Sequence, residues 1–350
     1  MRFALLKTII KKGDIFMAWY NTVGKENDVV VSSRIRFARN IADYPFDSKL
    51  DETSANEIIE KVSSALGNDF TKVDFKDVSA YEAAALVEKH YISPDFAKKK
   101  LPHTLFKNKK DGVAVMVCEE DHIRLQCILP GLSLDNAFKN ACIYDDVLDD
   151  NLNIAFSEKL GYLTHCPTNL GLAMRASVMV FLPALTMTKS MENLSVQLSK
   201  LGFIIRGMYG EGSQPDGCLY QISNRITMGV TEDDTIKRLE EIVTQICEKE
   251  RKAREIIKSD NLSLLADRIC RAYGTLKYAR VISSKEFLKL FADVRLGISL
   301  GLINDITYEA LGEIMIGVLP ANIVLRNGGK VISDFERDVL RADYIRESIG

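Results

Sequence analysis

The segment Cys166-Pro167-Thr168-Asn169-Leu170-Gly171, followed after three residues by Arg175-Ala176-Ser177-Val178, decides the fold. It joins a loop that contains a cysteine to an apolar stretch that begins just after an arginine. The apolar stretch, Val178–Met187, contains Pro183 and is about half as long as the roughly 20 residues that a membrane span needs. We therefore predict a buried strand and a turn after the cysteine loop.

Arginines lie beside predicted turns or strand ends in three other segments: Ser32-Ser33-Arg34-Ile35-Arg36, Glu119-Glu120-Asp121-His122-Ile123-Arg124 and Arg206-Gly207-Met208-Tyr209-Gly210-Glu211. The spacing of Arg34 and Arg36 puts both guanidinium groups on one face of a strand, where they could clamp phosphate oxygens. The chain contains no P-loop motif, so a nucleotide must be held in another way. Any one of these arginines by itself is more often a surface residue, and only their combination favours a phosphate site.

Together these four blocks, in this order, resemble the signature of the ATP:guanido phosphotransferases, the family of arginine and creatine kinases. The resemblance spans roughly residues 28–255. Within the family the chain is more similar to the bacterial protein-arginine kinases, because the first arginine block begins at residue 32 and leaves no room for the front helical domain, of about 100 residues, of the free-guanidine kinases. Met179 and the segment Arg337-Asp338-x-x-Arg341-Ala342 agree with that assignment.

This resemblance implies an α+β fold, in which an antiparallel sheet flanked by helices is followed by a small all-α domain. We expect a tail over residues 1–27, a catalytic domain over 28–255 and a helical domain over 260–350 that serves dimerisation and phosphoarginine binding. The residues themselves support helices after 260, because the apolar positions there follow helical spacing. A capping box at Ser54-Ala55-Asn56-Glu57 predicts a helix to about Leu66, and a Thr231 cap predicts one to about Lys258.

The implied activity is transfer of a phosphoryl group from ATP, with Mg²⁺ bridging phosphate oxygens, to arginine side chains of proteins. A guanidinium has a pKa above about 12, so a carboxylate must accept a proton before its nitrogen can attack. By resemblance, Glu120 and Glu211 grip the guanidinium, Cys166 lies beside it as a thiolate, and Glu119 belongs to the same site. The expected nucleotide site consists of Ser32, Ser33, Arg34, Ile35, Arg36, His90, Arg124, Arg175, Ala176, Ser177, Val178, Met179, Arg206, Gly207, Met208, Tyr209 and Gly210. Arg337, Asp338, Arg341 and Ala342 are expected to bind phosphoarginine away from that site, although a solvated salt-bridge face would have the same spacing. No residues are expected to ligate a metal directly.

Two departures from the family pattern concern the strand after the cysteine loop. The family usually continues this loop as Gly-Thr-Gly, whereas this chain has Gly171-Leu172-Ala173. Alanine costs roughly 1 kcal/mol or more if position 173 requires a left-handed backbone. Phe181 replaces a histidine common in the protein-arginine kinases and could simply pack. The alternatives are therefore a catalytically impaired adaptor that binds phosphoarginine, and a free-arginine kinase.

Composition excludes several classes of partner. The 46 basic and 48 acidic residues nearly cancel, so no overall charge favours nucleic acid or an anionic membrane. Seven cysteines without a CxxC pair indicate reduced thiols and a cytoplasmic protein. By resemblance we expect protein substrates with exposed arginines, a zinc-finger activator protein, a Clp ATPase and a homodimer, in a stress response that marks proteins for Clp proteolysis. Apolar positions in residues 290–303 could serve the dimer or the core.

Overall fold

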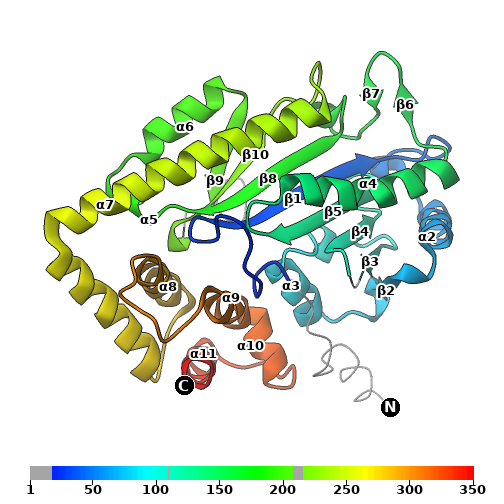
Figure 1. Cartoon of the computed structure of the whole chain (residues 1–350). Helices are drawn as coiled ribbons and strands as arrows, with labels where there is room; N and C mark the ends of the chain where they lie inside the picture. The colour runs from blue at the N-terminus through cyan, green and yellow to red at the C-terminus, as the bar shows by residue number, and fades with distance from the viewer. Residues whose placement is uncertain (1–17, 109, 208–215) are drawn as a thin grey trace.

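The computed structural model describes residues 18–108, 110–207 and 216–350, and its centre is an antiparallel sheet (Figure 1). Among these residues the sheet has eight strands in the order β2-β3-β4-β5-β1-β8-β10-β9, and every neighbouring pair is antiparallel. The strands are β1 (Val30–Arg39), β2 (Phe70–Asp74), β3 (Thr104–Asn108), β4 (Val113–Val117), β5 (Ile123–Pro130), β8 (Met174–Phe181), β9 (Phe203–Gly207) and β10 (Leu219–Asn224). A separate short hairpin is formed by β6 (Phe156–Ser157) and β7 (Gly161–Tyr162).

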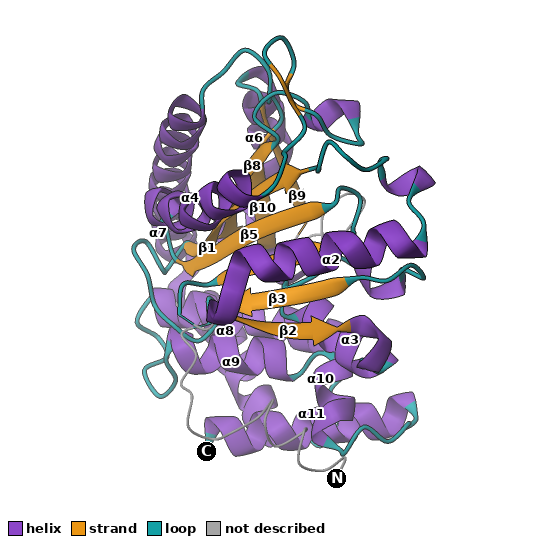
Figure 2. Cartoon of the chain, turned by 90° about the vertical axis from the view of Figure 1, so that its right-hand side faces the viewer, coloured by secondary structure: helices purple, strands orange, loops and turns teal. Residues whose placement is uncertain are grey.

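Helices surround this sheet and form the whole C-terminal part of the chain. They are α2 (Glu52–Leu66), α3 (Ala80–Glu88), α4 (Leu134–Asn151), α5 (Pro183–Met187), α6 (Met191–Lys200), α7 (Glu232–Tyr278), α8 (Ser284–Ser299), α9 (Tyr308–Gly317), α10 (Pro320–Arg326) and α11 (Asp334–Ile349). Figure 2 shows α8 to α11 gathered below the strands at one end of the molecule. The predicted α+β class is confirmed.

Side-chain caps explain where the helices begin. The predicted capping box at Ser54 is wrong, because the cap of α2 is Asp51, whose carboxylate accepts a hydrogen bond from the Ser54 amide (2.7 Å). The predicted cap of α7 is confirmed: the Thr231 hydroxyl accepts from the Asp234 amide at 3.1 Å. Because Asp51 lies three residues before Ser54, the helix starts three residues earlier than a cap at Ser54 would place it.

Helix α7 joins two helical stretches, and the predicted end near Lys258 lies close to the break between them. It runs to Tyr278 and is interrupted at Asn261, where the backbone is non-helical (φ −160°, ψ 82°). The Asn261 side chain accepts a hydrogen bond from the Leu264 amide (3.1 Å), as an N-cap does, so a second helical stretch starts directly where the first ends. Figure 1 shows the resulting bend.

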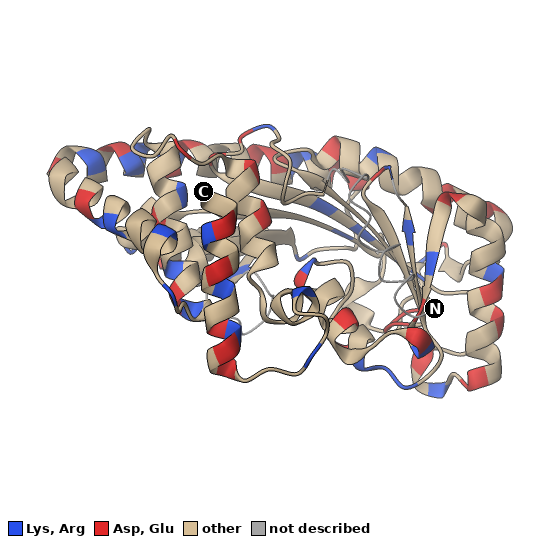
Figure 3. Ribbon diagram, turned by 90° about the horizontal axis from the view of Figure 1, so that it is seen from below, with Lys and Arg blue, Asp and Glu red and all other residues tan. Residues whose placement is uncertain are grey.

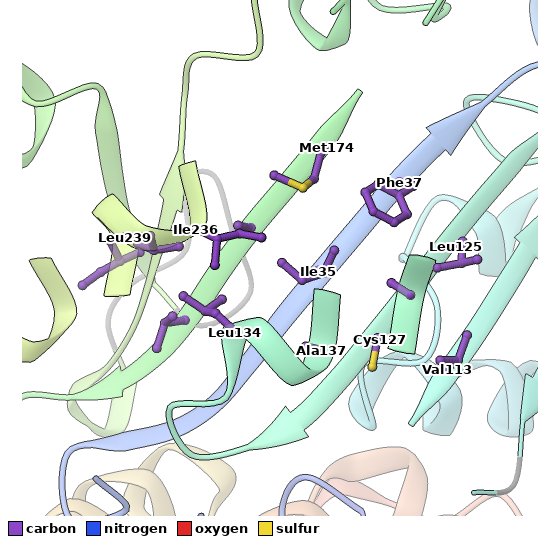
Figure 4. Packing of buried hydrophobic residues seen from close by; sticks show 14 of the residues in the cluster. Ile35, Phe37, Val113, Leu125, Cys127, Leu134, Ala137, Met174, Ile236 and Leu239 are labelled. Carbon is purple, nitrogen blue, oxygen red and sulfur yellow. The ribbon is translucent and has the colours of Figure 1, made fainter. Parts of the chain in front are cut away.

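One face of the sheet is covered by α2, α4 and the first part of α7. Alternate residues of the central strands, such as Ile35 and Phe37 on β1, form a core with Leu134 of α4 and Leu239 of α7 (Figure 4). Since side chains alternate along a strand, the residues between them must point to the opposite face. That opposite face includes Arg34 and Arg36.

The opposite face is covered only in part. Helices α7, α8, α9 and α11 form a second apolar cluster with Met179 and Phe181 of β8, and Leu219 of β10 joins it. A smaller cluster joins α3 to β3 and β4 through Phe96, Leu105 and Met116. No single helix among the described residues is long and apolar enough to cross a membrane, although α9 and α10 pass such a test together as a pair bent by 83°.

Candidate active site

The strand register brings the predicted arginines together on one face of the sheet. Arg36 of β1 lies opposite Arg175 of β8, and Arg34 lies opposite Ser177. On the other side of β1, Arg124 of β5 pairs with Ala38, two residues after Arg36. Residues directly opposite one another in antiparallel strands share a face, so these arginines converge from three adjacent strands. Figure 3 shows Lys and Arg positions on the strands as well as on the helices.

Arg206 of β9 belongs to the same face. It pairs with Gln221 of β10, which in turn pairs with Met179 of β8. The Gln221 side chain donates to the Ser177 hydroxyl (3.1 Å), which also accepts from Nε of Arg34 (3.4 Å). Polar side chains therefore extend from Arg34 to β10, the strand that pairs with Arg206.

The arginine face brings several positive charges close together. Burial, together with the charges of Arg124 and Arg175, lowers the pKa of Arg34 to about 9. The pKa of Arg36 is also lowered well below its ordinary value, by burial and by the charges of the other three arginines, against the opposing charge of Glu119. Among the described residues, the buried Nε of Arg36 has no hydrogen-bond partner. A polyanion bound here would relieve this repulsion and supply the missing acceptor.

His90 lies beside this face in a backbone conformation that is unusual for histidine. Its φ is +61°, and Gln126 of β5 donates to the carbonyl oxygens of His90 (2.9 Å) and Tyr91 (2.8 Å). The Trp19 ring packs edge-on against the imidazole, with 5.4 Å between centroids. Burial, together with Arg34 and Arg36, lowers the pKa of His90 to about 3, so it is neutral at physiological pH. Gln126 was not predicted, although its spacing of two from Arg124 indicates the same face.

Glu119 holds Arg124 in place. Both carboxylate oxygens accept from Nη1 of Arg124 at 2.6 Å, and the Ser93 hydroxyl donates to one of them at 2.6 Å. Burial alone would raise the pKa of Glu119, but the Arg124 charge and these hydrogen bonds outweigh it and lower the pKa to about 2. Such a carboxylate is a weak base that is already occupied, so its geometry suits orientation of Arg124.

Glu120 has the opposite character. Its side chain is exposed, and its pKa is raised by partial burial and by the charges of Asp121 and Glu119, against Arg124 and His165. A raised pKa makes a carboxylate a better proton acceptor. Adjacent residues of one turn therefore provide an anchored carboxylate and an available one.

Cys166 begins a short 3-10 turn, Pro167–Asn169, and is partly exposed. Its thiol lies 3.0 Å from the Thr168 hydroxyl, and its carbonyl accepts from the Thr164 hydroxyl (2.8 Å). The loop is tied to the acidic turn by a hydrogen bond from the His165 amide to Oδ1 of Asp121 (2.7 Å). The structure thus brings the cysteine loop next to the turn that carries Glu120.

The cysteine loop ends at Leu172 and Ala173, where the family usually has threonine and glycine. The backbone at Ala173 is strained. Ala173 has a φ of +46°, which favours glycine. Gly171 is required by a close approach, because a Cβ there would lie 2.2 Å from the Thr227 carbonyl oxygen. The chain folds around alanine nevertheless, and the Ala173 carbonyl accepts a hydrogen bond from Ala38 of β1 (2.9 Å).

Several residues of the predicted nucleotide segments face elsewhere. Ile35, Ala176 and Val178 are fully buried in the core under α4 and α7, whereas Met179 shares the face of the arginines but packs there in the second cluster. The Ser33 hydroxyl is fully buried and donates to the Gly131 carbonyl (2.8 Å). These side chains support the strands rather than line the arginine face. Ser32 and Gly207 are also buried, and Met208, Tyr209, Gly210 and Glu211 lie outside the described residues.

The predicted phosphoarginine segment lies on α11, apart from the arginine face. Arg341 is fully buried and donates to the carbonyls of Val318 (2.9 Å) and Ile282 (2.8 Å), with Asp338 as its ionic partner. Ala342 packs in the second apolar cluster. Two buried guanidinium atoms, Nη2 of Arg341 and Nε of Arg337, have no hydrogen-bond partner within the described ranges.

Phe181 packs, as its aromatic side chain suggests. Its ring lies 6.4 Å from that of Phe291 on α8, and the Arg295 guanidinium lies 5.3 Å from its centroid. In the part of the chain that the structure describes, no three His, Cys, Asp or Glu side chains are grouped to hold a metal ion.

Two family models match the chain. The ATP:guanido phosphotransferase C-terminal catalytic domain matches residues 53–253, and the protein-arginine kinase McsB C-terminal domain matches residues 263–350. The protein-arginine kinase of Caldanaerobacter subterraneus subsp. tengcongensis is 43% identical over 333 residues, which cover 93% of this chain and 98% of that protein. That of Bacillus subtilis strain 168 is 40% identical over 343 residues, or 96% of this chain and 94% of that protein.

Solved structures share the fold. The duplicated taurocyamine kinase from Schistosoma mansoni with bound transition state analog components has a TM-score of 0.61 and 26% identity over 76% of this chain. This chain spans only 42% of that longer one. Lombricine kinase has a TM-score of 0.56 and 22% identity, over 66% of this chain and 68% of that one, a likeness in fold alone.

Proposed function

Because the chain belongs to the protein-arginine kinases of the ATP:guanido phosphotransferase family, we propose that it transfers the γ-phosphoryl group of ATP to arginine side chains of other proteins. The observation that carries this proposal is the convergence of Arg34, Arg36, Arg124 and Arg175 on one sheet face, beside a turn that presents the available carboxylate of Glu120.

The arginines bind the triphosphate and stabilise the charge that develops as the phosphoryl group moves. They suit this role because a bound anion would relieve their mutual repulsion, and because Glu119 already fixes the orientation of Arg124. Mg²⁺ supplies further charge neutralisation when bound. It binds through phosphate oxygens and water more readily than through a dedicated protein cage, in keeping with the lack of an acidic cluster in the described ranges.

The carboxylates act on the substrate. Glu120 accepts a proton from the guanidinium and aligns one nitrogen with the γ-phosphorus, a task that the family resemblance also assigns to Glu211. Cys166 lies at the same site and contributes an electrostatic contact with the guanidinium, without a covalent intermediate. Positioning of this kind accounts for most of the rate in phosphoryl transfer.

The finer setting of the activity follows from the family. We propose that the enzyme marks proteins for Clp proteolysis in a stress response, in the cytoplasm, as a homodimer with a zinc-finger activator. Arg337, Asp338 and Arg341 form a second site for phosphoarginine. The unpartnered Nη2 of Arg341 and Nε of Arg337 support that site, because a phosphoryl group would supply acceptors for both.

A second candidate is an adaptor that binds phosphoarginine without catalysis, and the positive φ of Ala173 favours it. The intact arginine face favours the kinase. To separate them, the protein is incubated with ATP, Mg²⁺ and an arginine-rich protein, and phosphorylated sites are identified by mass spectrometry under non-acidic conditions. We expect acid-labile phosphate on protein arginines.

Arg36→Ala is expected to lower the rate of transfer about 100-fold, as loss of one transition-state contact does. Arg271→Ala is the matched control, because Arg271 is exposed on α7 and pairs only with Asp267 there. Phosphate on free arginine alone would overturn the assignment of protein substrates. Absence of any transfer, even with the activator, would favour the adaptor.

A further inference from the structure

Glu120 and Cys166 lie on two loops that neither a helix nor the main sheet holds together. Glu120 is in the turn between β4 and β5, and Cys166 follows the short strand β7. Catalysis by alignment requires such groups to be held within about half an ångström of the productive geometry. Contacts between the two loops must therefore fix their separation.

Asp121 provides the first of these contacts. Its side chain is only 3% exposed, although it is adjacent to the exposed Glu120. Oδ1 of Asp121 accepts hydrogen bonds from the backbone amide of His165 (2.7 Å) and from Nδ2 of Asn40 (2.6 Å). One carboxylate oxygen next to Glu120 thus holds the residue next to Cys166.

Asn40 extends this link to the end of β1. Its side chain is 1% exposed, and its amide nitrogen also donates to the Leu163 carbonyl (3.0 Å). Its side-chain carbonyl oxygen, Oδ1, accepts a hydrogen bond from the backbone amide of His122 (2.9 Å). Both donors and the acceptor of Asn40 are therefore used, so a single rigid side chain joins the acidic turn, the cysteine loop and the central strand.

His122 holds the same turn from a third direction. The imidazole is fully buried, and its Nδ1 accepts from the Ile41 amide (3.1 Å), so Nε2 carries the proton and donates to the Pro45 carbonyl (2.9 Å). The acidic turn is thereby fastened to the segment after β1 at Asp121 and at His122. These bonds of His122 do not set the distance between the acidic turn and the cysteine loop. Among the hydrogen bonds described above, those that join the turn to that loop come from Asp121 and Asn40.

We propose that Asn40 and Asp121 are positioning residues for phosphoryl transfer, whose hydrogen bonds set the separation of Glu120 and Cys166 across the substrate guanidinium. Both residues act through Glu120 and Cys166 rather than by touching the substrate. The inference rests on the proposed function, since it assigns a role in that same site. It extends the site to Asn40, which lies outside the four sequence blocks, and to Asp121, which lies in the acidic block beside Glu120.

Position and charge can be separated at Asp121. Asp121→Ala removes both the acceptor and the negative charge near Glu120. Asp121→Asn removes the charge but keeps a carbonyl oxygen, and because both hydrogen bonds end on Oδ1, that oxygen can retain them. Asn40→Ala removes the link from the other side and keeps the charge of Asp121.

The experiment compares these variants of the full chain by kcat, by KM for a protein substrate and by the Kd for ATP. We expect Asp121→Ala and Asn40→Ala to lower kcat about 100-fold, the effect of a displacement near 1 Å, with the Kd for ATP unchanged. Asp121→Asn should restore most of the lost kcat. The double variant Asn40→Ala/Asp121→Ala should be no worse than the poorer single variant, because both break one link. Asn153→Ala, which breaks an exposed bond to Asp43 (3.1 Å), is the matched control.

Three outcomes would overturn the proposal. Wild-type kcat in Asp121→Ala and Asn40→Ala would show that the link is dispensable. Equal loss in Asp121→Asn and Asp121→Ala would assign the effect to charge. A parallel loss of ATP affinity would indicate general damage to the fold.

Alkylation of Cys166 by iodoacetamide, mapped to its peptide by mass spectrometry, gives a readout that needs no phosphoryl transfer. Its rate at one fixed pH should change in Asp121→Ala and Asn40→Ala, where the loop is released, and remain close to that of the wild type in Asp121→Asn, where the hydrogen bonds can persist. An unchanged rate in all variants would count against the proposal. Failure of the proposed function would instead be seen as absence of phosphoarginine with the wild-type protein, whatever the alkylation shows.

Discussion

Ala173 adopts a left-handed backbone that costs a residue with a Cβ about 1–2 kcal/mol. Ala173→Gly should therefore raise the free energy of unfolding by about 0.5–1 kcal/mol, since the greater freedom of glycine in the unfolded chain offsets part of the relief. Chemical denaturation measures this change. Ala176→Gly, in the middle of β8, is the control and should lower stability. A destabilised Ala173→Gly protein would show that the positive φ carries no strain.

At the acidic turn, the raised pKa of Glu120 predicts a pH dependence of kcat. A base acts in its ionised form, so activity is present above its pKa and is lost as the pH falls through it. Because burial and the charges of Asp121 and Glu119 raise this pKa, against Arg124 and His165, the loss should begin at a higher pH than for an ordinary glutamate. Glu120→Gln should lower kcat about 10²–10⁴-fold and abolish this limb of the profile. A profile unchanged in shape in that variant would exclude Glu120 as the base.

The site could be predicted from sequence where its chemistry lies in short motifs. Arg34, Arg36, Arg124 and Arg175 were predicted as one phosphate site, and strand register explains why residues so far apart in the chain meet. Asn40 could not be found in this way. Its role depends on hydrogen bonds to residues more than 80 positions away, and an asparagine after a strand usually reads as a turn.

Among the secondary-structure elements, α10 depends on a cap from another part of the chain. The Glu88 carboxylate, at the end of α3, accepts from the amides of Ala321 (2.7 Å) and Asn322 (3.0 Å) and from the Asn322 side chain (2.6 Å). Glu88→Ala leaves these donors unsatisfied and should cost about 1–3 kcal/mol in stability.

Glu88→Gln keeps one acceptor oxygen and is expected to lose less, which thermal and chemical denaturation can compare. His90 follows Glu88 by two residues at the arginine face, so KM for ATP should rise in Glu88→Ala. If Glu88→Ala unfolds like the wild type, α10 is held by its apolar contacts alone.

Elements with a clear apolar pattern or cap signal were predicted, as for the strand after the cysteine loop (β8) and the helix that Thr231 caps (α7). The strands β2 and β3 and the helix α10 were not predicted. Strand β2 lies at the sheet edge and exposes Thr71 and Lys72 in succession, so it lacks alternation. Helix α10 has only seven residues and begins at Pro320, and its start is satisfied by a distant carboxylate that no local pattern reveals.

For the whole molecule, the second apolar cluster decides how the C-terminal helices relate to the sheet. It contains side chains of β8 and β10 as well as of α7, α8, α9 and α11, and Trp19 from the segment before β1. Helix α7 also links the two parts through the chain itself. Its first part packs on the sheet, and its second part packs on α8. The helical part thus covers a portion of the sheet face that carries the arginines.

Such a shared core predicts a single cooperative unfolding transition. Trp19 is the only tryptophan of the chain and is buried in the second cluster, so its fluorescence reports on the junction, whereas far-UV circular dichroism reports on all helices. Both signals should change at the same denaturant concentration. Phe181→Ala, which removes the ring between β8 and Phe291, should lower stability by about 3–5 kcal/mol and shift both transitions together. Phe335→Ala is the matched control, because Phe335 is exposed on α11, and it should change stability by less than about 0.5 kcal/mol. If the Trp19 signal changed well before the circular dichroism, the helical part would be a separately folding unit whose contact with the sheet adds little to stability.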